Sequence, residues 1–571
     1  MDPSRQGKIN RRHFIGQVAR GAAFLGAGTA LTGLPSCGGN EEYDLLIFGG
    51  TVYDGLGNPG IEGDVAIREG RIFRIAPRLK KRRAGMVIDA RGMAVAPGFI
   101  DPHSHTDTEL IANPRGESYI RQGITTAIGG NCGSSWFPVG DATFSEWKEM
   151  IREELDIEMD WKTVDGLFGR LESTGIAYNF ATLVGHGAIR RMAMGLRNGA
   201  PTDKELELMK RLLERTLRSG VYGLSTGLEY LPGTYAQPEE ITELCRLVAE
   251  WGGVYATHMR SEGDSLLEAL DESITVARES GVSLEISHLK VAYPENWSKI
   301  DAAIGKVEDA LDEGIEIEVD RYPYTAASTG LALYFPSWAI SASVETCTAR
   351  LKNPANSSRL NAHLDLMGKK LGSWNRVSIV SVHREENMKY QGKDIVTAAA
   401  MAKLDVNDFL RELMIAEKLR VSMNTHMMNE QNTRRILAHP LTSICTDAVS
   451  RAPYGVLGKS VPHPRTYGAF PRVLGKYVRE EKLFPLHEAI RKMTSKTAHK
   501  FGINARGMLK AGCFADVVVF DPATVRDTAT WSDPHRYPEG IPNVIVNGVP
   551  VIRDGEHSGR LPGMLLRKER Q

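Results

Sequence analysis

The feature that most constrains the fold is a repeated alternation of short apolar segments with amphipathic helical segments through the middle of the chain. A helical example is DKELELMKRLLERTLRSG at 203–220, where apolar residues recur every three or four positions. Eight strand-like segments alternate with such helices, which is the pattern of βα units around a parallel barrel. The sequence therefore predicts an α/β fold with a (β/α)8 TIM-type barrel over residues 98–500.

Most of the strand-like segments end in a residue that can bind a metal ion. On a strand, residues i and i+2 point to one face, so His103 and His105 in PGFIDPHSH can reach the same ion. In a barrel, all strand ends of one polarity face the same rim. We therefore expect a metal site there. The ends, in chain order, are His103 and His105, Cys132, His186, Ser225, His258, His288, the IEIEVDRYPYT stretch, and Asp447.

Short alternating strands with Gly and Asp-Gly turns flank the barrel on both sides. They occupy 42–97, in segments such as DLLIFGGTVYDG, and 507–560, in segments such as PNVIVNGVPVIRDG. Strands before and after a central body can pair with one another. We expect one small β-sandwich domain built from both termini.

Charge and cysteine content exclude several classes of protein. The 70 basic and 70 acidic residues balance, and KKRR at 80–83 is isolated, so no nucleic-acid partner is expected. The six cysteines show no CxxC pairing and are too sparse for a disulfide framework. The expectation of a small-molecule partner rests on the family resemblance described below.

The first 37 residues are typical of an export signal. Arg11 and Arg12 precede an apolar run at 21–34 that is too short to span a bilayer. NRRHFIG at 10–16 resembles the twin-arginine export signal, and LPSC at 34–37 resembles a lipoprotein cleavage box whose lipidated residue would be Cys37. A cleaved signal without lipid, or a plain amphipathic leader, is the alternative. We expect export to the periplasm or cell envelope, with membrane attachment through Cys37.

The chain resembles the amidohydrolase superfamily and, within it, the N-acyl-D-amino-acid deacylase (D-aminoacylase) family. The resemblance covers nearly the whole chain after Glu41. It is carried by PGFIDPHSH, by NCG with Cys132, by the THMR and SHLK histidines, by DRYPYTA, and by TDA with a downstream HPR.

This resemblance implies a zinc-dependent hydrolase that cleaves the amide bond of N-acyl-D-amino acids to a carboxylate and a free D-amino acid. Asp447 would accept a proton from water and return it to the leaving amine. The tight Zn²⁺ site would use Cys132, His258 and His288; a second, weaker site would use His103, His105 and Asp447 and share Cys132. The substrate α-carboxylate would be bound by Lys290, Tyr322, Ser328 and Arg465. The resemblance also implies an inserted lid at about 383–430.

Three further residues have open interpretations. His186 either touches substrate or makes a structural hydrogen bond. Glu229 is left outside the metal set, because loop carboxylates usually face water. Arg321 either reads an acidic side chain or points outward into a surface salt bridge.

Two other functions are consistent with parts of the pattern. One is another amidohydrolase reaction, either hydrolysis of a cyclic amide or cleavage of D-configured or N-acylated dipeptides. Cyclic-amide enzymes generally use a bridging carboxylated lysine, and the fourth strand end reads LSTGLEY without one. The other is a binding or scaffold lipoprotein on a degenerate barrel, which would be expected to have lost a ligand or the aspartate.

The export signal predicts where the full-length protein resides. Expressed in a bacterial host, it should be processed in a globomycin-sensitive step and appear in the membrane fraction of the envelope. Replacing Cys37 with Ala is the matched control and should release it from that fraction. Globomycin-insensitive processing without a membrane fraction would refute lipidation.

Overall fold

The computed structural model describes residues 43–570. The export signal and lipidation site predicted for residues 1–37 lie outside the described residues. Within the described range, no helix combines the length and the apolar character that crossing a bilayer requires.

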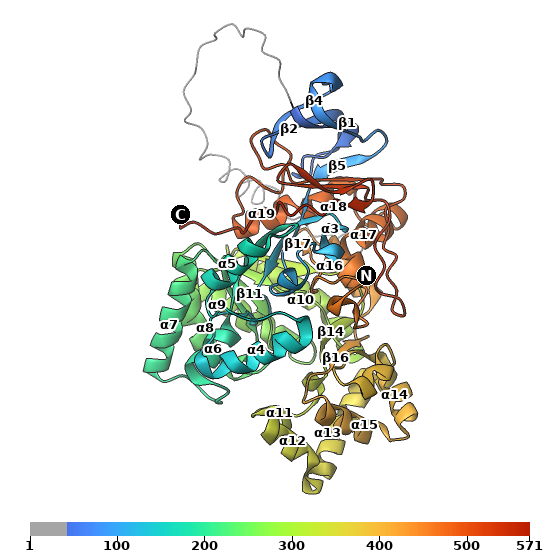
Figure 1. Cartoon of the computed structure of the whole chain (residues 1–571). Coiled ribbons are helices and arrows are strands. Elements are labelled where there is room, and N and C mark those ends of the chain that lie inside the picture. Colours follow the sequence, from blue (N-terminus) through green and yellow to red (C-terminus); the bar gives the residue numbers. More distant parts are fainter. Residues whose placement is uncertain (1–42, 571) are drawn as a thin grey trace, which may run out of the picture. The chain divides into compact units, whose positions relative to one another are not determined.

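The centre of the described chain is a closed barrel of parallel strands, which confirms the predicted fold (Figure 1). The Tyr222 amide donates to the Thr182 carbonyl at 2.9 Å and joins the third strand to the fourth. The Asp447 amide donates to the His103 carbonyl at 2.9 Å and joins the last strand end to the first. The barrel strands are β6 (Phe99–Asp101), β7 (Ile124–Gly129), β8 (Asn179–Thr182), β10 (Gly223–Gly227), β11 (Val254–His258), β12 (Ser283–Ile286), β13 (Ile317–Arg321) and β17 (Thr442–Ile444).

Burial explains why these segments form strands and their neighbours form helices. Every residue of β7, β10 and β11 is buried, as expected for parallel strands covered on both faces. The helix with the clearest sequence pattern begins with a capping box, in which Thr202 and Glu205 bond each other's backbone amides. The helices around the barrel are α4 (Asp141–Leu155), α5 (Val164–Thr174), α6 (His186–Met194), α7 (Asp203–Arg218), α8 (Pro238–Glu250), α9 (Leu266–Ser280), α10 (Ile300–Asp312), α16 (Glu430–Ala438), α17 (Arg465–Arg472), α18 (Leu486–Met493) and α19 (Ser495–Phe501).

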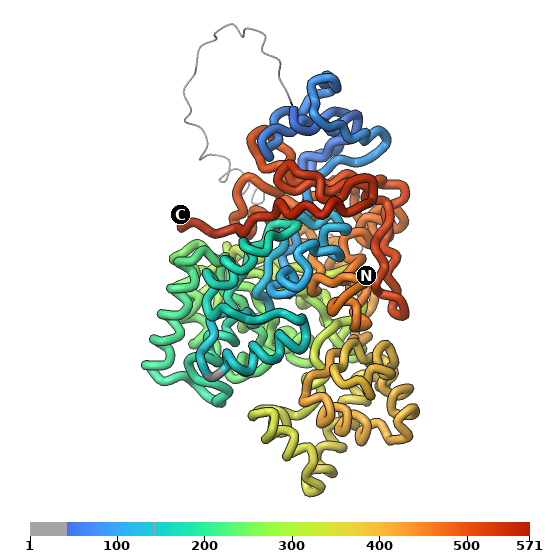
Figure 2. The backbone as a smooth tube through the Cα atoms, in the orientation of Figure 1, coloured from blue at the N-terminus to red at the C-terminus, as the bar shows by residue number. Residues whose placement is uncertain are grey.

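Strands from both ends of the described chain form one sheet (Figure 2). β18 pairs antiparallel with β5, so the two ends are joined directly. All of these strands belong to one hydrogen-bonded sheet, which forks where β1 pairs with β4 along one part and with β5 along another. Its strands are β1 (Tyr43–Val52), β2 (Ile61–Arg68), β3 (Arg71–Ala76), β4 (Ala84–Asp89), β5 (Ala94–Pro97), β18 (Val517–Phe520), β19 (Asn543–Val546), β20 (Val549–Arg553) and β21 (Glu556–His557).

The side chains of β18 alternate between two hydrophobic clusters, and one of these clusters packs the sheet against the barrel. Val518 and Phe520 belong to the large hydrophobic cluster that includes Phe99 of the barrel, whereas Val517 and Val519 face a separate cluster within the sheet. Both faces of this strand are therefore buried.

The insertion before the last barrel strand is larger than the predicted 383–430. β14 pairs antiparallel with β16, with Ala327 opposite Thr425, so these two strands set its limits. The segment implied by the family resemblance left out the strands and helices on its N-terminal side. A separate hydrophobic cluster from Leu331 to Met423 fills the lobe seen low in Figure 1. Its elements are β14 (Ala327–Gly330), α11 (Ser337–Ile340), α12 (Val344–Lys352), α13 (Ser357–Leu371), β15 (Val377–Ser381), α14 (Ile395–Ala402), α15 (Val406–Ala416) and β16 (Ser422–Thr425).

Candidate metal centre

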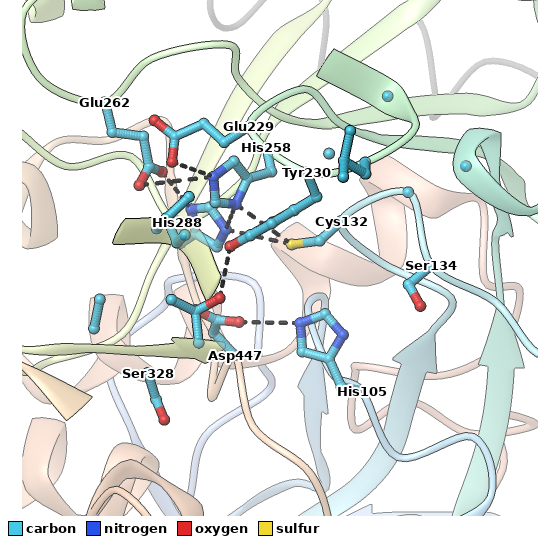
Figure 3. A pocket seen from close by; sticks show the side chains of 18 of the residues that line it. His105, Cys132, Ser134, Glu229, Tyr230, His258, Glu262, His288, Ser328 and Asp447 are labelled. Carbon is cyan, nitrogen blue, oxygen red and sulfur yellow. Dashed lines mark hydrogen bonds and ion pairs between the residues drawn. The ribbon is translucent and has the colours of Figure 1, made fainter. Parts of the chain in front are cut away.

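A cavity of about 440 Å³ opens at the carboxyl ends of the barrel strands (Figure 3). His105, Cys132, His258, His288 and Asp447 all line it, although 342 positions separate His105 from Asp447. Barrel closure thus brings the predicted strand-end residues to one place, which is where TIM barrels carry their active sites.

Cys132, His258 and His288 form a compact group of three donor atoms. The Cys132 Sγ lies 3.8 Å from Nδ1 of His258 and 3.4 Å from Nε2 of His288, and these two nitrogens are 3.0 Å apart. A tetrahedral zinc ion with ordinary bond lengths separates two nitrogen ligands by about 3.4 Å and a sulfur from a nitrogen by about 3.6 Å. The three residues therefore fit zinc.

A second group of donor atoms shares the cysteine. His103 Nε2 lies 3.2 Å from the Cys132 Sγ and 3.5 Å from Oδ1 of Asp447. His105 Nε2 lies 3.2 Å from the same carboxylate oxygen. The predicted second set is thus close enough to hold another ion, with Cys132 and Asp447 between the two groups.

Three residues of this centre have a strained backbone. Cys132, His288 and Asp447 have φ angles of +52°, +37° and +49°, in the left-handed region that side chains rarely adopt. Each of the three residues follows the end of a barrel strand and turns its side chain into the cavity. Strain of this kind costs of order 1–3 kcal/mol per residue and persists where the surrounding structure fixes it.

Three carboxylates stand behind the histidines and were not predicted as site residues. Glu229 Oε2 lies 3.3 Å from Nε2 of His258. This loop carboxylate, which was expected to face water, therefore orients a candidate metal ligand. Glu262 Oε1 lies 3.0 Å from Nδ1 of His288. Asp320 approaches His103 Nδ1 at 3.4 Å and accepts a hydrogen bond from the His288 amide at 2.8 Å. Such partners fix the ring orientation of metal-binding histidines.

The electrostatics favour anionic forms of the sulfur and the carboxylate. Burial raises the pKa of the Cys132 thiol, but the charges of His103 and His288 outweigh it and hold that pKa well below its usual value. Burial likewise raises the pKa of Asp447, and Arg465 and His288 more than reverse the effect. A thiolate is the form of cysteine that binds zinc.

The residues predicted to bind a carboxylate differ in their exposure to the cavity. Lys290, Tyr322 and Ser328 line it, and the buried Tyr322 hydroxyl has no hydrogen-bond partner among the described residues. Arg465 already has a partner within the site, because its Nη1 donates to Oδ2 of Asp447 at 2.8 Å. It therefore positions that carboxylate.

Two of the open residues lie away from the metal centre. His186 Nε2 lies 2.8 Å from Oε1 of buried Glu240, which also accepts a hydrogen bond from Arg190, so its contact is structural. Arg321 is 1% exposed and its Nη2 donates to the Thr433 hydroxyl at 3.1 Å. The Arg321 guanidinium therefore neither reaches the surface nor lines the cavity.

Comparison with known proteins gives consistent matches. The profile of the amidohydrolase family matches residues 86–552. The chain is 36% identical to a D-aminoacylase of Alcaligenes xylosoxydans xylosoxydans over 526 residues, which cover 91% of this chain and 98% of the relative. The structure of an N-acyl-D-glutamate deacylase from Bordetella bronchiseptica, complexed with zinc and a phosphonate inhibitor, superposes with a TM-score of 0.78 at 33% identity, covering 92% of this chain and all (100%) of that one. A D-aminoacylase structure described by its binuclear metal centre gives a TM-score of 0.77 at 34% identity, with 92% and 100% covered.

These matches extend over the barrel, the terminal sheet and the insertion together, at identities well above those that show a fold alone. The chain belongs to the amidohydrolase family, in the group that includes D-aminoacylase and N-acyl-D-glutamate deacylase.

Proposed function

We propose that this protein is a zinc-dependent hydrolase that cleaves N-acyl-D-amino acids into a carboxylate and a free D-amino acid. The observation that carries the proposal is the triad of donor atoms from Cys132, His258 and His288 next to an arginine-held Asp447, at zinc-compatible distances. The D configuration is supported by the relatives, which are named for D-configured amino acids.

The chemistry divides between the metal and one carboxylate. Cys132, His258 and His288 would hold zinc, which when bound lowers the pKa of a water molecule and polarises the amide carbonyl. Asp447 would accept a proton from the attacking water, while the water oxygen bonds to the carbonyl carbon. The same carboxyl group then returns the proton to the nitrogen as the C–N bond breaks. Arg465 donates a hydrogen bond to Oδ2 of Asp447 and so keeps this carboxylate oriented during both proton transfers.

Lys290 and Tyr322 supply the groups that bind the substrate α-carboxylate. Lys290 is 2% exposed, and its Nζ lies 6.0 Å from the centroid of the Tyr322 ring. The Tyr322 hydroxyl, unpartnered among the described residues, faces the same cavity. A substrate carboxylate between them would satisfy the hydroxyl and pair with the cation.

Hydrolysis of linear amides is favoured over opening of cyclic amides. Cys132 approaches both groups of histidines, because its Sγ contacts His103, His258 and His288. The fourth strand ends at Gly227, so no lysine stands at that strand end to bridge two ions. Lys290 lines the cavity, but its Nζ is held by Glu262 and lies 2.7 Å from Nδ1 of His288.

Asp447→Asn tests the reaction and its mechanism. The zinc-loaded wild type should hydrolyse N-acetyl-D-methionine in strong preference to the L enantiomer. The variant should lose activity by about 10²–10⁴-fold, the usual contribution of a general acid–base, while keeping its metal. Asp527→Asn, which alters another arginine-paired aspartate outside the cavity, should remain active. Retained activity in Asp447→Asn, or equal rates on both enantiomers, would sink the proposal.

Cys132→Ala tests the metal ligands. The variant should lose zinc on dialysis, with a fall in affinity larger than the roughly 10–100-fold cost of losing a hydrogen-bond partner behind a ligand. Atomic emission of the dialysed protein measures the metal content. Cys245→Ala removes another buried thiol, in α8, and should keep its zinc. Full zinc content in Cys132→Ala would refute the assignment.

Lys290→Met tests recognition of the carboxylate. Loss of a charge-assisted hydrogen bond, worth about 1.5–3 kcal/mol, should lower kcat/KM for N-acetyl-D-methionine by about 10–150-fold. The same substrate with its carboxylate converted to a carboxamide should be much less affected. Zinc content is measured in parallel, because Lys290 contacts Glu262. Equal losses on both substrates would show that Lys290 does not read the carboxylate.

A further inference from the structure

The cavity has a second wall, opposite the residues that bind the α-carboxylate. Ser328 and Glu262 lie on one side of the candidate ligands, and Ser134 lies on the other side, beyond Cys132 (Figure 3). Lys290 contacts Glu262 on the first side, and the Gly187 amide bonds the Gly133 carbonyl next to Ser134 on the second. We call the wall on the Ser134 side the α6 wall. It consists of Trp147, Gly187, Ala188, Arg191 and Pro232, all of which line the cavity.

The inner part of the α6 wall, beside the metal centre, is made of backbone. The Gly187 amide donates to the Gly133 carbonyl at 3.0 Å, directly after Cys132 in the chain. A Cβ atom at Gly187 would lie 2.7 Å from that carbonyl oxygen and 3.7 Å from Cδ of Pro232. These segments pack so closely that no side chain projects between them, and the wall is smooth where a substrate acyl group would begin.

The outer part of the α6 wall carries a cation. Gly187 and Arg191 are four residues apart in α6, so they share one face of the helix and lie about 6 Å apart along its axis. The Arg191 guanidinium carbon lies 5.9 Å from the centroid of the Trp147 ring. Trp147 is itself fixed edge-on against Trp136, at 5.2 Å between centroids.

Arg191 has donors to spare for a ligand. Its Nη2 donates to Oε2 of Glu146 at 2.7 Å, and no other hydrogen bond of this side chain occurs among residues 43–570. The Glu146 side chain is 57% exposed, and an ion pair so accessible to water contributes about 0–1 kcal/mol. A guanidinium offers five N–H donors, so a carboxylate in the cavity can bind Arg191 while the hydrogen bond to Glu146 stays in place.

The part of the substrate that meets the α6 wall follows from connectivity. The α-carboxylate and the side chain of the amino acid leave the same carbon atom, which Lys290 and Tyr322 place on the first wall. The scissile carbonyl lies at the metal centre between the walls. The acyl chain therefore leaves toward α6, whereas the amino-acid side chain stays on the side of Lys290 and Tyr322.

We infer that the α6 wall is an acyl-chain subsite and that Arg191 selects acyl groups ending in a carboxylate, of about the length of glutaryl. The 6 Å or so between Gly187 and Arg191 corresponds to roughly four or five bonds of an extended chain. The inference deepens the proposed function and rests on it. It assigns the acyl group, rather than the amino-acid side chain, as the acidic part of the preferred substrate.

The test compares N-glutaryl-, N-pentanoyl- and N-acetyl-D-methionine as substrates of the zinc-loaded, full-length protein. Glutaryl and pentanoyl have the same five-carbon chain and differ in the terminal carboxylate. In the wild type, kcat/KM should be about tenfold higher for glutaryl than for pentanoyl. Arg191→Met should bring this ratio to about one. Glu146→Gln, which removes the competing carboxylate, should preserve or raise it.

Three results would overturn the inference in distinguishable ways. Cleavage of none of the three substrates means that the proposed function fails, and the inference fails with it. Cleavage of the acetyl substrate with a wild-type glutaryl-to-pentanoyl ratio near one leaves the function standing and refutes the acyl subsite. A selective loss on N-acetyl-D-glutamate relative to N-acetyl-D-glutamine in Arg191→Met would show that Arg191 reads the amino-acid side chain.

Discussion

The contact on which the site depends is the closure of the barrel between its first and last strand ends. The Asp447 amide donates to the His103 carbonyl at 2.9 Å, and the His105 amide donates to the Ala448 carbonyl at 2.8 Å. These bonds join parts of the chain more than 300 positions apart. Without them, the carboxylate proposed to move protons would have no fixed relation to the sulfur and imidazoles proposed to hold zinc. The terminal sheet supports the same closure, because β5 leads directly into β6.

Much of the fold and several site residues are predictable, because the relevant signals are local. Parallel strands covered on both faces are continuous apolar runs, and the residue after each run must emerge at one rim. Cys132, His258 and His288 could therefore be placed together before any coordinates. The closed barrel is confirmed. The limits of the insertion were harder to predict, because β14 is a four-residue strand whose partner lies almost 100 positions away, from Ala327 to Thr425.

The residues that sequence reasoning missed act through other residues. Glu229 and Glu262 lie in loops, where carboxylates usually face solvent, and only the packed structure turns them toward imidazole nitrogens. Asp320 stands inside a predicted strand, next to Arg321, and nothing in its local pattern distinguishes a barrel-facing aspartate from one that faces a helix. Arg465 was predicted to bind the substrate α-carboxylate, and its partner in the structure is Asp447. Which acceptor an arginine binds depends on the packed tertiary structure, and the local sequence does not reveal it.

The charges gathered at the centre give an independent argument for a divalent cation. In their ionised forms, the Cys132 thiolate and the Asp447, Asp320 and Glu262 carboxylates contribute four negative charges. Lys290 and Arg465 contribute two positive charges. Buried charges that lack compensation cost several kcal/mol each, and the three carboxylates are at most 7% exposed. Without metal, the protonated histidines that hold down the Cys132 pKa offset this excess. A divalent ion bound by neutral imidazoles would take over that role, so metal binding should stabilise the fold as well as supply the chemistry.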